Sequence, residues 1–489
     1  MKYKKLFVLV FATFSSQLLF GQKQGVDRPN FVLIIADDIG WGDIGFFGNK
    51  DVKTPNIDAL GASGLTFKNM YVTTSSCSPS RCSIISGRYP HNTGAPELHD
   101  QLPDDQFMFP EKLKNIGYYT ALSGKNHMGG AVKKAFNLIS LGKGPGGEED
   151  WVSILKGRPA NKPFFLWFAA HDAHRDWQTN DKGVVYDAEK LTVPPMLYNG
   201  IETRKDLASY YHEISRLDHH VGNVVAELKR QGILENTYII FISDNGSPFP
   251  RNKVRLYDSG VKSPFIVKGP GIKVAETEAL LSTIDIAPTI FEIAGLKKDE
   301  RIQGTSFLSL LNGKQHSTRD FIFTEHNWHV FQGYERMVRY KNWVYIRNGF
   351  PERRAMAGES SKLFPAGKEL WEKHEQGLTK KNQEDVFLMP RPAEELFNVA
   401  KDPFQFTNVA AAASNKNMLS YLREAVDTWI METGDSKPRN PTPDRDDIDG
   451  KKLPGEWLKG EKPGEANKAS QINRSGPVLK KDIKMKEPV

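Results

Sequence analysis

Residues 30–38 read Asn-Phe-Val-Leu-Ile-Ile-Ala-Asp-Asp, and this stretch decides the fold. The run from Phe31 to Ala36 is apolar at every position, without the alternation of a half-buried strand, and it ends in Asp37 and Asp38. A continuous apolar run of this length is typical of a strand buried on both faces of a parallel sheet. We therefore predict a buried strand over residues 30–36 that delivers two carboxylates to the carboxyl edge of the sheet.

Similar apolar runs recur farther along the chain. We predict further buried strands over residues 118–122, 164–169, 238–242 and 265–268. Pro55, followed by Ile57, Leu60 and Ala62 at helical spacing, predicts a helix beginning at residues 54–56, and a long helix is expected over residues 207–231. Alternating strands and helices indicate a doubly wound, mostly parallel α/β sheet flanked by helices, with functional residues at the carboxyl ends of its strands.

The pattern changes near residue 334. Residues 337–347 and 395–399 look like strands of an antiparallel sheet, and a helix is predicted over residues 417–432. We expect a catalytic domain over residues 22–333, a smaller α+β domain over 334–435, and an extended tail over 436–489. The tail is rich in Lys, Pro, Gly and Asp with little periodicity, which indicates a segment wrapped over the surface rather than a further fold.

The first 21 residues have the order of a secretory signal peptide. Three lysines precede an apolar run over residues 6–20, and a small residue, Gly21, ends it. The alternative is a membrane anchor, but the run is shorter than the ~20 residues that a spanning helix needs. The formal charge of +7 includes the three leader lysines, so the mature chain has only a mild basic excess. We expect export to the periplasm, no stable membrane anchor and no nucleic-acid partner.

The two cysteines of the chain both lie in one short segment. It reads Cys77-Ser78-Pro79-Ser80-Arg81-Cys82 and ends in Ser86-Gly87-Arg88. This segment resembles the type I sulfatase signature C-x-P-S-R. The resemblance implies that Cys77 is oxidised to formylglycine by a formylglycine-generating or anaerobic sulfatase-maturating enzyme, and that Arg81 steadies the hydrated aldehyde. One hydroxyl of that diol attacks sulfur and the other later expels sulfate. The alternative is a Cys77–Cys82 disulfide, which would gain little because its loop is small.

Four oxygen ligands for a metal are implied by the same resemblance. They are Asp37 and Asp38 after the first strand and Asp244 and Asn245 after the strand at residues 238–242. Taken singly, an Asp-Asp pair is usually a cap and Asp-Asn-Gly is usually a hairpin turn. Together, after two buried strands, they favour a hard site for Ca²⁺, with Mg²⁺ as the alternative and the diol at position 77 as a further ligand.

Other catalytic residues follow from motifs in the family's order. Lys125 is similar to the lysine that binds sulfate, and His127 to the histidine that contacts the diol; Asn126 stands where a Trp is common. His174 matches the residue on the leaving-group side, where a general acid would protonate an expelled sugar oxygen or amine, with His171 as the competing choice.

Lys253 matches the lysine that neutralises sulfate oxygens in the transition state. It stands five residues before the position where the family commonly has Glu-Gly-Gly. Here Asp258 and Ser259 replace the Glu and the first Gly, so this loop departs from the commonest pattern.

Several local features resemble the sulfamidase branch, the N-sulfoglucosamine sulfohydrolases. They include His99 and the segment Ser247-Pro248-Phe249-Pro250. Residues 325–329, Glu-His-Asn-Trp-His, either line a sugar subsite or pack between the domains. The candidate substrate-binding residues are His99, His326, His329 and Arg336.

The function expected from these motifs is hydrolysis of sulfate esters or sulfamates on oligosaccharides, during degradation of a sulfated polysaccharide such as heparan or ulvan. Two rivals remain. One is a phosphodiesterase or phosphonate monoester hydrolase of the alkaline phosphatase superfamily, and the other is a catalytically silent carbohydrate-binding relative. Such a silent relative would be expected to lack the nucleophile or several cationic residues, and none of these is missing here.

Overall fold

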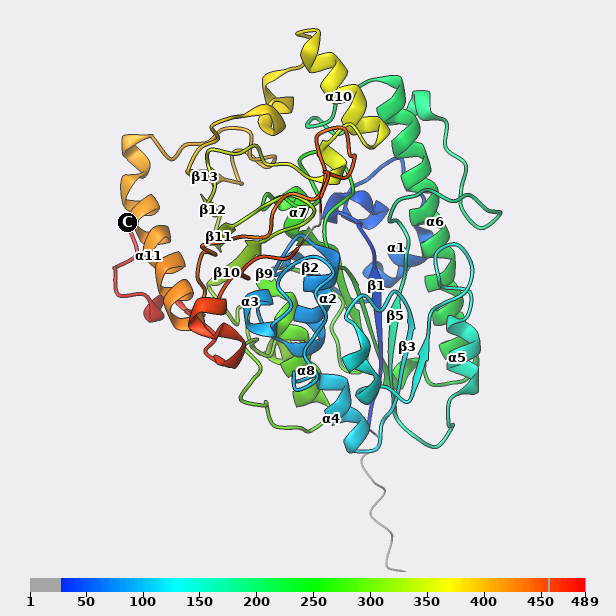
Figure 1. Cartoon of the computed structure of the whole chain (residues 1–489). Helices are drawn as coiled ribbons and strands as arrows, with labels where there is room; N and C mark the ends of the chain where they lie inside the picture. Colours follow the sequence, from blue (N-terminus) through cyan, green and yellow to red (C-terminus); the bar gives the residue numbers. More distant parts are fainter. Residues whose placement is uncertain (1–27, 456–457, 489) are drawn as a thin grey trace, which may run out of the picture.

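The computed structural model describes residues 28–455 and 458–488. The leader expected at residues 1–21 lies outside this part of the chain. Among the helices that the structure describes, none combines the length and the apolar character needed to cross a bilayer. Two sheets organise the molecule, a large one in the body and a small one beside it (Figure 1).

The large sheet confirms the predicted α/β class. Its order is β4-β3-β5-β1-β6-β8-β2-β7, with β9 paired to β2. All neighbours on the β4 to β6 side are parallel, whereas β8 runs antiparallel to both β6 and β2. The strands are β1 (Asn30–Ala36), β2 (Leu65–Tyr71), β3 (Tyr119–Gly124), β4 (Leu138–Ser140), β5 (Phe164–Ala169), β6 (Thr237–Ser243), β7 (Lys262–Ser263), β8 (Phe265–Lys268) and β9 (Ala275–Ser282).

The register of the central strands explains where the functional residues meet. In β1, Ala36 pairs with Ser243 of β6 and Ile35 with Ala169 of β5. In β3, Gly124 pairs with the same Ala169. The carboxyl ends of β1, β3, β5 and β6 therefore coincide at one edge, and the residues that follow each strand are brought together there.

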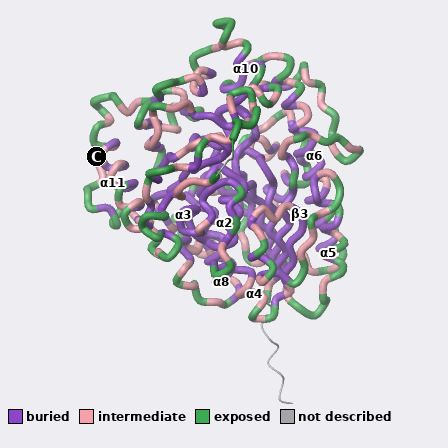
Figure 2. The backbone as a smooth tube through the Cα atoms, viewed as in Figure 1, coloured by how far each residue is buried: buried purple, intermediate pink, exposed green. Residues whose placement is uncertain are grey.

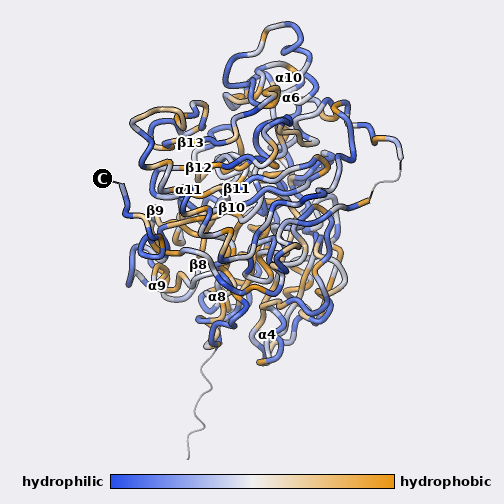
Figure 3. Tube along the Cα trace, turned by 60° about the vertical axis from the view of Figure 1, so that its left-hand side comes forward, coloured by the Kyte–Doolittle hydropathy of each residue, from blue (hydrophilic) through white to orange (hydrophobic). Residues whose placement is uncertain are grey.

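Helices cover both faces of this sheet. Val32 and Ile34 of β1 pack with residues of α1 (Pro55–Ala62), α5 (Trp151–Gly157) and α6 (Ile201–Arg230). Phe31, Leu33 and Ile35 face the opposite layer, which contains α2 (Cys77–Ser86), α4 (Phe109–Asn115) and α8 (Ile286–Ile293). The buried residues run through the sheet and α2 (Figure 2), and hydrophilic segments predominate along the outer loops (Figure 3).

The smaller sheet is antiparallel, in the order β10-β11-β12-β13. Its strands are β10 (Phe321–His326), β11 (Glu335–Tyr340), β12 (Trp343–Asn348) and β13 (Glu394–Asn398). One face packs on α11 (Lys416–Thr433), and the other contacts Tyr71, Val72 and Tyr257 of the larger domain. Since β10 precedes residue 334, this sheet takes its first strand from a segment that we assigned to the catalytic domain. The remaining α-helices of the described residues are α3 (Pro90–Thr93), α7 (Asp258–Val261), α9 (Leu308–Leu311) and α10 (Pro365–Glu375).

The tail after Asp435 lies over the catalytic domain near α3 (Figure 1). Asn92 donates from Nδ2 to the carbonyl oxygen of Ala469 at 2.7 Å, and Arg88 donates from Nη1 to Asn473 Oδ1 at 2.7 Å. Arg88 is the arginine that ends the cysteine motif, so the tail is tied to the segment that carries Cys77.

Candidate active site

Three buried carboxylates lie together at the carboxyl edge of the large sheet. Asp37 and Asp38 follow β1, Asp244 follows β6, and one carboxylate oxygen from each lies within 4.8 Å of the others. Asp38 has a φ of 61°, a strained conformation for a residue other than glycine. Its Oδ1 accepts a hydrogen bond from Asn245 Nδ2 at 2.7 Å. The predicted metal ligands are therefore adjacent in the structure.

The donor set fits a divalent cation. Asp37 Oδ1 and Asn245 Oδ1 are enclosed and have no hydrogen-bond partner among the described residues. Buried oxygens without a partner cost free energy, and three clustered carboxylates repel one another. Hard oxygen donors of this kind suit Ca²⁺ or Mg²⁺. A cation held here would relieve both costs.

Three cationic side chains surround these carboxylates. Arg81 donates from Nε to Asp244 Oδ2 at 2.8 Å, Lys253 Nζ lies 2.7 Å from Asp38 Oδ2, and Lys125 Nζ contacts Asp37 Oδ2. Burial alone would raise the pKa of Asp37, but Lys125 and Arg81 hold it well below its usual value. Burial raises the pKa of Asp244 to about 7 although Arg81 opposes it. Three cations thus balance three carboxylates, and an added divalent ion would make the site attract an anion.

Cys77 is the first residue of α2, and only 2% of it is exposed. Ser76 before it is extended, and Gly87 ends the helix at a φ of 66°, where a Cβ would approach Ala287 Cβ to 3.1 Å. Cys77 and Cys82 are both free thiols, so the alternative disulfide is not formed. Burial raises the pKa of the Cys77 thiol, with Lys125 and Lys253 opposing. A thiol with a raised pKa is a weak nucleophile near neutral pH.

The histidines predicted around the nucleophile fall into two groups. His174 Nε2 lies 4.0 Å from Asp38 Oδ2, and burial, with Lys125 and Lys253, lowers the pKa of His174. His127 Nε2 lies 2.9 Å from His99 Nδ1, and both residues have positive φ, 52° and 64°. Burial and Lys125 lower the pKa of His127 to about 2. His99, predicted to bind substrate, therefore contacts His127, which was predicted to contact the diol.

The other two histidines predicted to bind substrate, His329 and His326, contact different residues. His329 Nδ1 lies 2.8 Å from Ser76 Oγ, directly before Cys77, so the fold brings it to the nucleophile segment. His326 is buried, and its Nδ1 lies 3.8 Å from Glu335 Oε2.

Arg336 is fully buried, and its guanidinium donates to both carboxylate oxygens of Asp435, at 2.5 and 2.9 Å. Its charge is therefore paired with the last residue of the predicted smaller domain.

Glu359 is a site residue that sequence reasoning missed. Its Oε1 lies 3.8 Å from Lys253 Nζ, and only 7% of the residue is exposed. Its Oε2 is enclosed and finds no hydrogen-bond partner within residues 28–455 and 458–488. It comes from a short turn after β12, more than 100 residues beyond Lys253. No motif surrounds it, so only the packing of the two domains could reveal it.

Comparison with known proteins agrees with this geometry. The profile described as Sulfatase matches residues 29–137 and 149–296, more than half of the chain, and the profile described as N-sulphoglucosamine sulphohydrolase, C-terminal, matches residues 251–346. An ulvan-active sulfatase of Formosa agariphila is 29% identical over 84% of this chain and 76% of its own length. The human N-sulphoglucosamine sulphohydrolase is 27% identical over 83% of this chain and 91% of its own.

A solved structure of a protein in complex with its substrate D-glucosamine-2-N,6-O-disulfate has the same fold. It superposes with a TM-score of 0.65 at 18% identity, over 83% of this chain and 98% of its own. At this identity the likeness concerns the fold alone, and the profile matches carry the assignment. The chain belongs to the sulfatase family, enzymes that hydrolyse sulfate esters.

Proposed function

We propose that this protein is an exported, periplasmic sulfatase that removes sulfate from oligosaccharides of a sulfated polysaccharide. The observation that carries this proposal is the position of Cys77 within the electrostatic field of Lys125 and Lys253, at the edge that holds the three carboxylates. The substrate class is supported by the relatives, which include an ulvan-active sulfatase and an N-sulphoglucosamine sulphohydrolase. Both O-sulfated algal sugars and N-sulfated glucosamine are therefore candidates.

Residue 77 would act as the nucleophile. Oxidised to formylglycine, it would supply a hydrated aldehyde with a hydroxyl as the attacking group. The unmodified thiol is a poorer candidate, because burial raises its pKa and leaves little thiolate near neutral pH. Its place at the first turn of α2 adds the positive end of the helix dipole, which favours negative charge there. Arg81, which donates to Asp244 and lies 3.5 Å from Asp37 Oδ1, would hold the surrounding carboxylates in place.

A Ca²⁺ ion held by Asp37, Asp38, Asp244 and Asn245 would supply Lewis-acid polarisation of a sulfate oxygen. Lys125 and Lys253 carry the ammonium groups that would bind the remaining sulfate oxygens as their charge grows in the transition state. Preorganised cations in an enclosed site stabilise such charge without reorganising during the reaction. The strained backbone at Asp38 and His127 is consistent with side chains held for function.

The test of the proposed function is a substrate panel with the purified native protein. We expect release of sulfate from oligosaccharides of ulvan or heparan, loss of this activity with EDTA, and recovery with Ca²⁺. A phosphodiester and a phosphonate monoester serve as the rival substrates. Faster turnover of either rival than of every sulfated sugar would overturn the proposal, and so would full activity in EDTA.

His174→Ala is expected to slow hydrolysis of a sugar sulfate about 10²- to 10⁴-fold, the contribution typical of a general acid. The sugar leaving group has a high pKa and needs a proton, whereas a nitrophenolate does not. Hydrolysis of an activated aryl sulfate should therefore fall much less. The measurement is kcat/KM for both substrates.

His171→Ala is the matched control, because His171 lies three residues earlier in the same loop and its pKa is also lowered by burial. We expect similar, small effects on both substrates in this variant. An equal loss on both substrates in His174→Ala would remove His174 from the acid role.

A further inference from the structure

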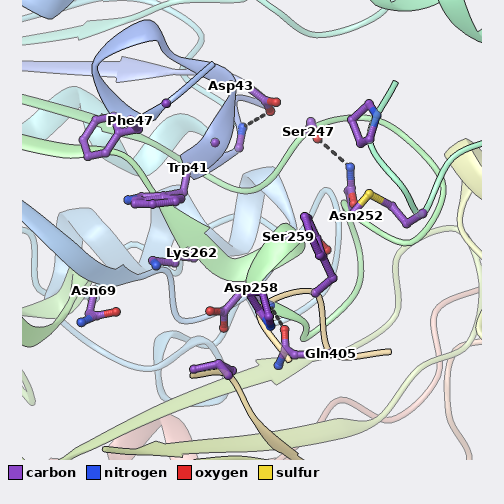
Figure 4. A pocket seen from close by; sticks show the side chains of 18 of the residues that line it. Trp41, Asp43, Phe47, Asn69, Ser247, Asn252, Asp258, Ser259, Lys262 and Gln405 are labelled. Carbon is purple, nitrogen blue, oxygen red and sulfur yellow. Dashed lines mark hydrogen bonds between the residues drawn. The ribbon is translucent and has the colours of Figure 1, made fainter. Parts of the chain in front are cut away.

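A cavity lies beside the loops that carry the predicted metal ligands and Lys253, but it is lined by other residues. Its volume is about 580 Å³, and it is bordered by the loop after β1, by Lys262 of β7, by Arg339 of β11 and by residues 399–405. The residues that line it do not include Cys77, the three clustered carboxylates, Lys125, His174 or Lys253. Figure 4 shows Trp41, Lys262, Asp258 and Gln405 around this space. A cavity of this size accommodates a ligand much larger than a single ion.

Two cations border the cavity without an ion pair among the described residues. Lys262 is half-buried, and its Nζ lies 3.9 Å from the centre of the Trp41 ring. Arg339 is only 3% exposed, and its Nε and Nη1 have no hydrogen-bond partner in the part of the chain that the structure describes. Burial lowers the pKa of Lys262, with Asp258 opposing and Arg339 adding to the effect. The two charges are close enough to repel, and each contacts an aromatic ring, Trp41 for Lys262 and Tyr71 for Arg339, rather than a carboxylate of the described residues.

The carboxylates nearest to these cations are held by other groups. Asp258 Oδ1 accepts a hydrogen bond from the Tyr71 hydroxyl at 3.1 Å. Glu278 lies 3.4 Å from Lys68 Nζ and accepts from Asn69 Nδ2 at 3.1 Å. Neither carboxylate forms an ion pair with Lys262 or Arg339. The two unpaired cations are therefore available to an external anion.

The remaining lining combines polar and apolar groups. Gln405 is 1% exposed, its Oε1 accepts from the backbone N–H of Asp258 at 2.6 Å, and its Nε2 has no partner among the described residues. Asn69 and Asn342 add amide groups to the wall, and apolar surface comes from Phe47, Met196, Val399 and Phe404. Such a wall suits a compact molecule with hydroxyl groups and an apolar face as well as a charge.

We propose that this cavity binds a small anionic saccharide, a one- or two-ring sugar that bears a carboxylate or a sulfate, through Lys262 and Arg339. The anionic group pairs with the two cations, the amides of Asn69, Asn342 and Gln405 bind hydroxyls, and the apolar wall contacts the ring. A buried, unpaired arginine costs folding free energy. The ligand that neutralises it removes that cost, which gives the binding its driving force. None of the predicted catalytic or metal-binding residues lines this cavity, so the inference does not depend on the proposed function.

The test is calorimetric titration of the full chain, carrying Cys77→Ala so that no sulfated probe is hydrolysed, with glucuronate, glucose 6-sulfate and inorganic sulfate. We expect at least one sugar anion to bind with a stoichiometry of one at this cavity. Arg339→Met should weaken its binding at least about tenfold, as the loss of a charge-assisted contact does. Lys262→Gln should also weaken binding of the sugar anion, so the proposal can still be tested if one of the two variants folds poorly.

Arg347→Met is the matched control, since Arg347 lies on the neighbouring strand β12 and is paired at the surface with Asp427. It should leave binding unchanged. Arg339→Met should also raise the Tm of the probe-free protein, because it removes an unpaired buried charge.

Three results would overturn the proposal. The first is that neither sugar anion binds, and the second is that inorganic sulfate binds as tightly as the sugars. The third is that Lys125→Ala abolishes binding whereas Arg339→Met leaves it intact, because the anion would then lie at the catalytic edge.

Discussion

Replacing Cys77 with alanine is expected to lower kcat/KM for every sulfate ester by about 10⁴-fold or more, the order of loss seen when a covalent nucleophile is removed. The reason is that residue 77 is the proposed covalent nucleophile, at the first turn of α2 and within the electrostatic field of Lys125 and Lys253. The measurement is hydrolysis of an activated aryl sulfate, for which leaving-group protonation is unimportant. Activity above about 1% of the native rate in this variant would contradict a covalent mechanism at residue 77.

Cys82→Ala is the matched control, because Cys82 lies on the same helix, is fully buried and belongs to the hydrophobic core. Its removal leaves a small cavity and should cost about 1 kcal/mol of stability while retaining activity. Mass spectrometry of the peptide that contains Cys77 supplies the complementary readout. We expect a loss of about 18 Da at this residue in the native protein, the change from a thiol side chain to formylglycine.

Arg336→Met is expected to destabilise the protein by about 3–5 kcal/mol, the usual cost of removing one partner of a buried ion pair. Asp435 would remain enclosed without its cation. Burial alone raises the pKa of Asp435, yet Arg336 holds it down at about 2. Because the folded pKa is depressed, this pair stabilises the protein above the ordinary pKa of a carboxyl, and that contribution is lost as the pH falls toward 2. Denaturant unfolding at neutral pH measures the change.

Two controls define the outcome. Arg347→Met removes an arginine whose partner Asp427 is largely exposed, and it should cost at most about 1 kcal/mol. The double variant Arg336→Met/Asp435→Asn should recover part of the loss, since no unpaired charge then remains. Unchanged stability of Arg336→Met together with a raised KM would instead support the substrate-binding role predicted from the sequence.

Much of the fold followed from local patterns. The strands β1, β3, β5, β6 and β8 are mainly apolar, and all five were predicted with errors of at most two residues at their ends. The strand β2 was not predicted, because Lys68 and Asn69 interrupt its apolar sequence, although it pairs with three neighbours. The two-residue strand β7 has no recognisable pattern at all. Such strands are defined by their partners rather than by their own composition.

The sequence by itself determined which chemical groups follow the strands at the carboxyl edge of the large sheet. Asp37, Asp38 and Asp244 directly follow β1 and β6, and parallel strands with a common register bring such ends together. Cys77 and Lys253 were recognised from short motifs in the segments beyond β2 and β6. Tertiary structure decided the contacts between residues that lie far apart in the sequence. Glu359 beside Lys253, Arg336 on Asp435, and the cavity between Lys262 and Arg339 join residues that are about 75 to more than 100 positions apart. The packing of the two domains decides whether such side chains form an ion pair, face a ligand or only pack. Local periodicity in the sequence carries no information about that packing.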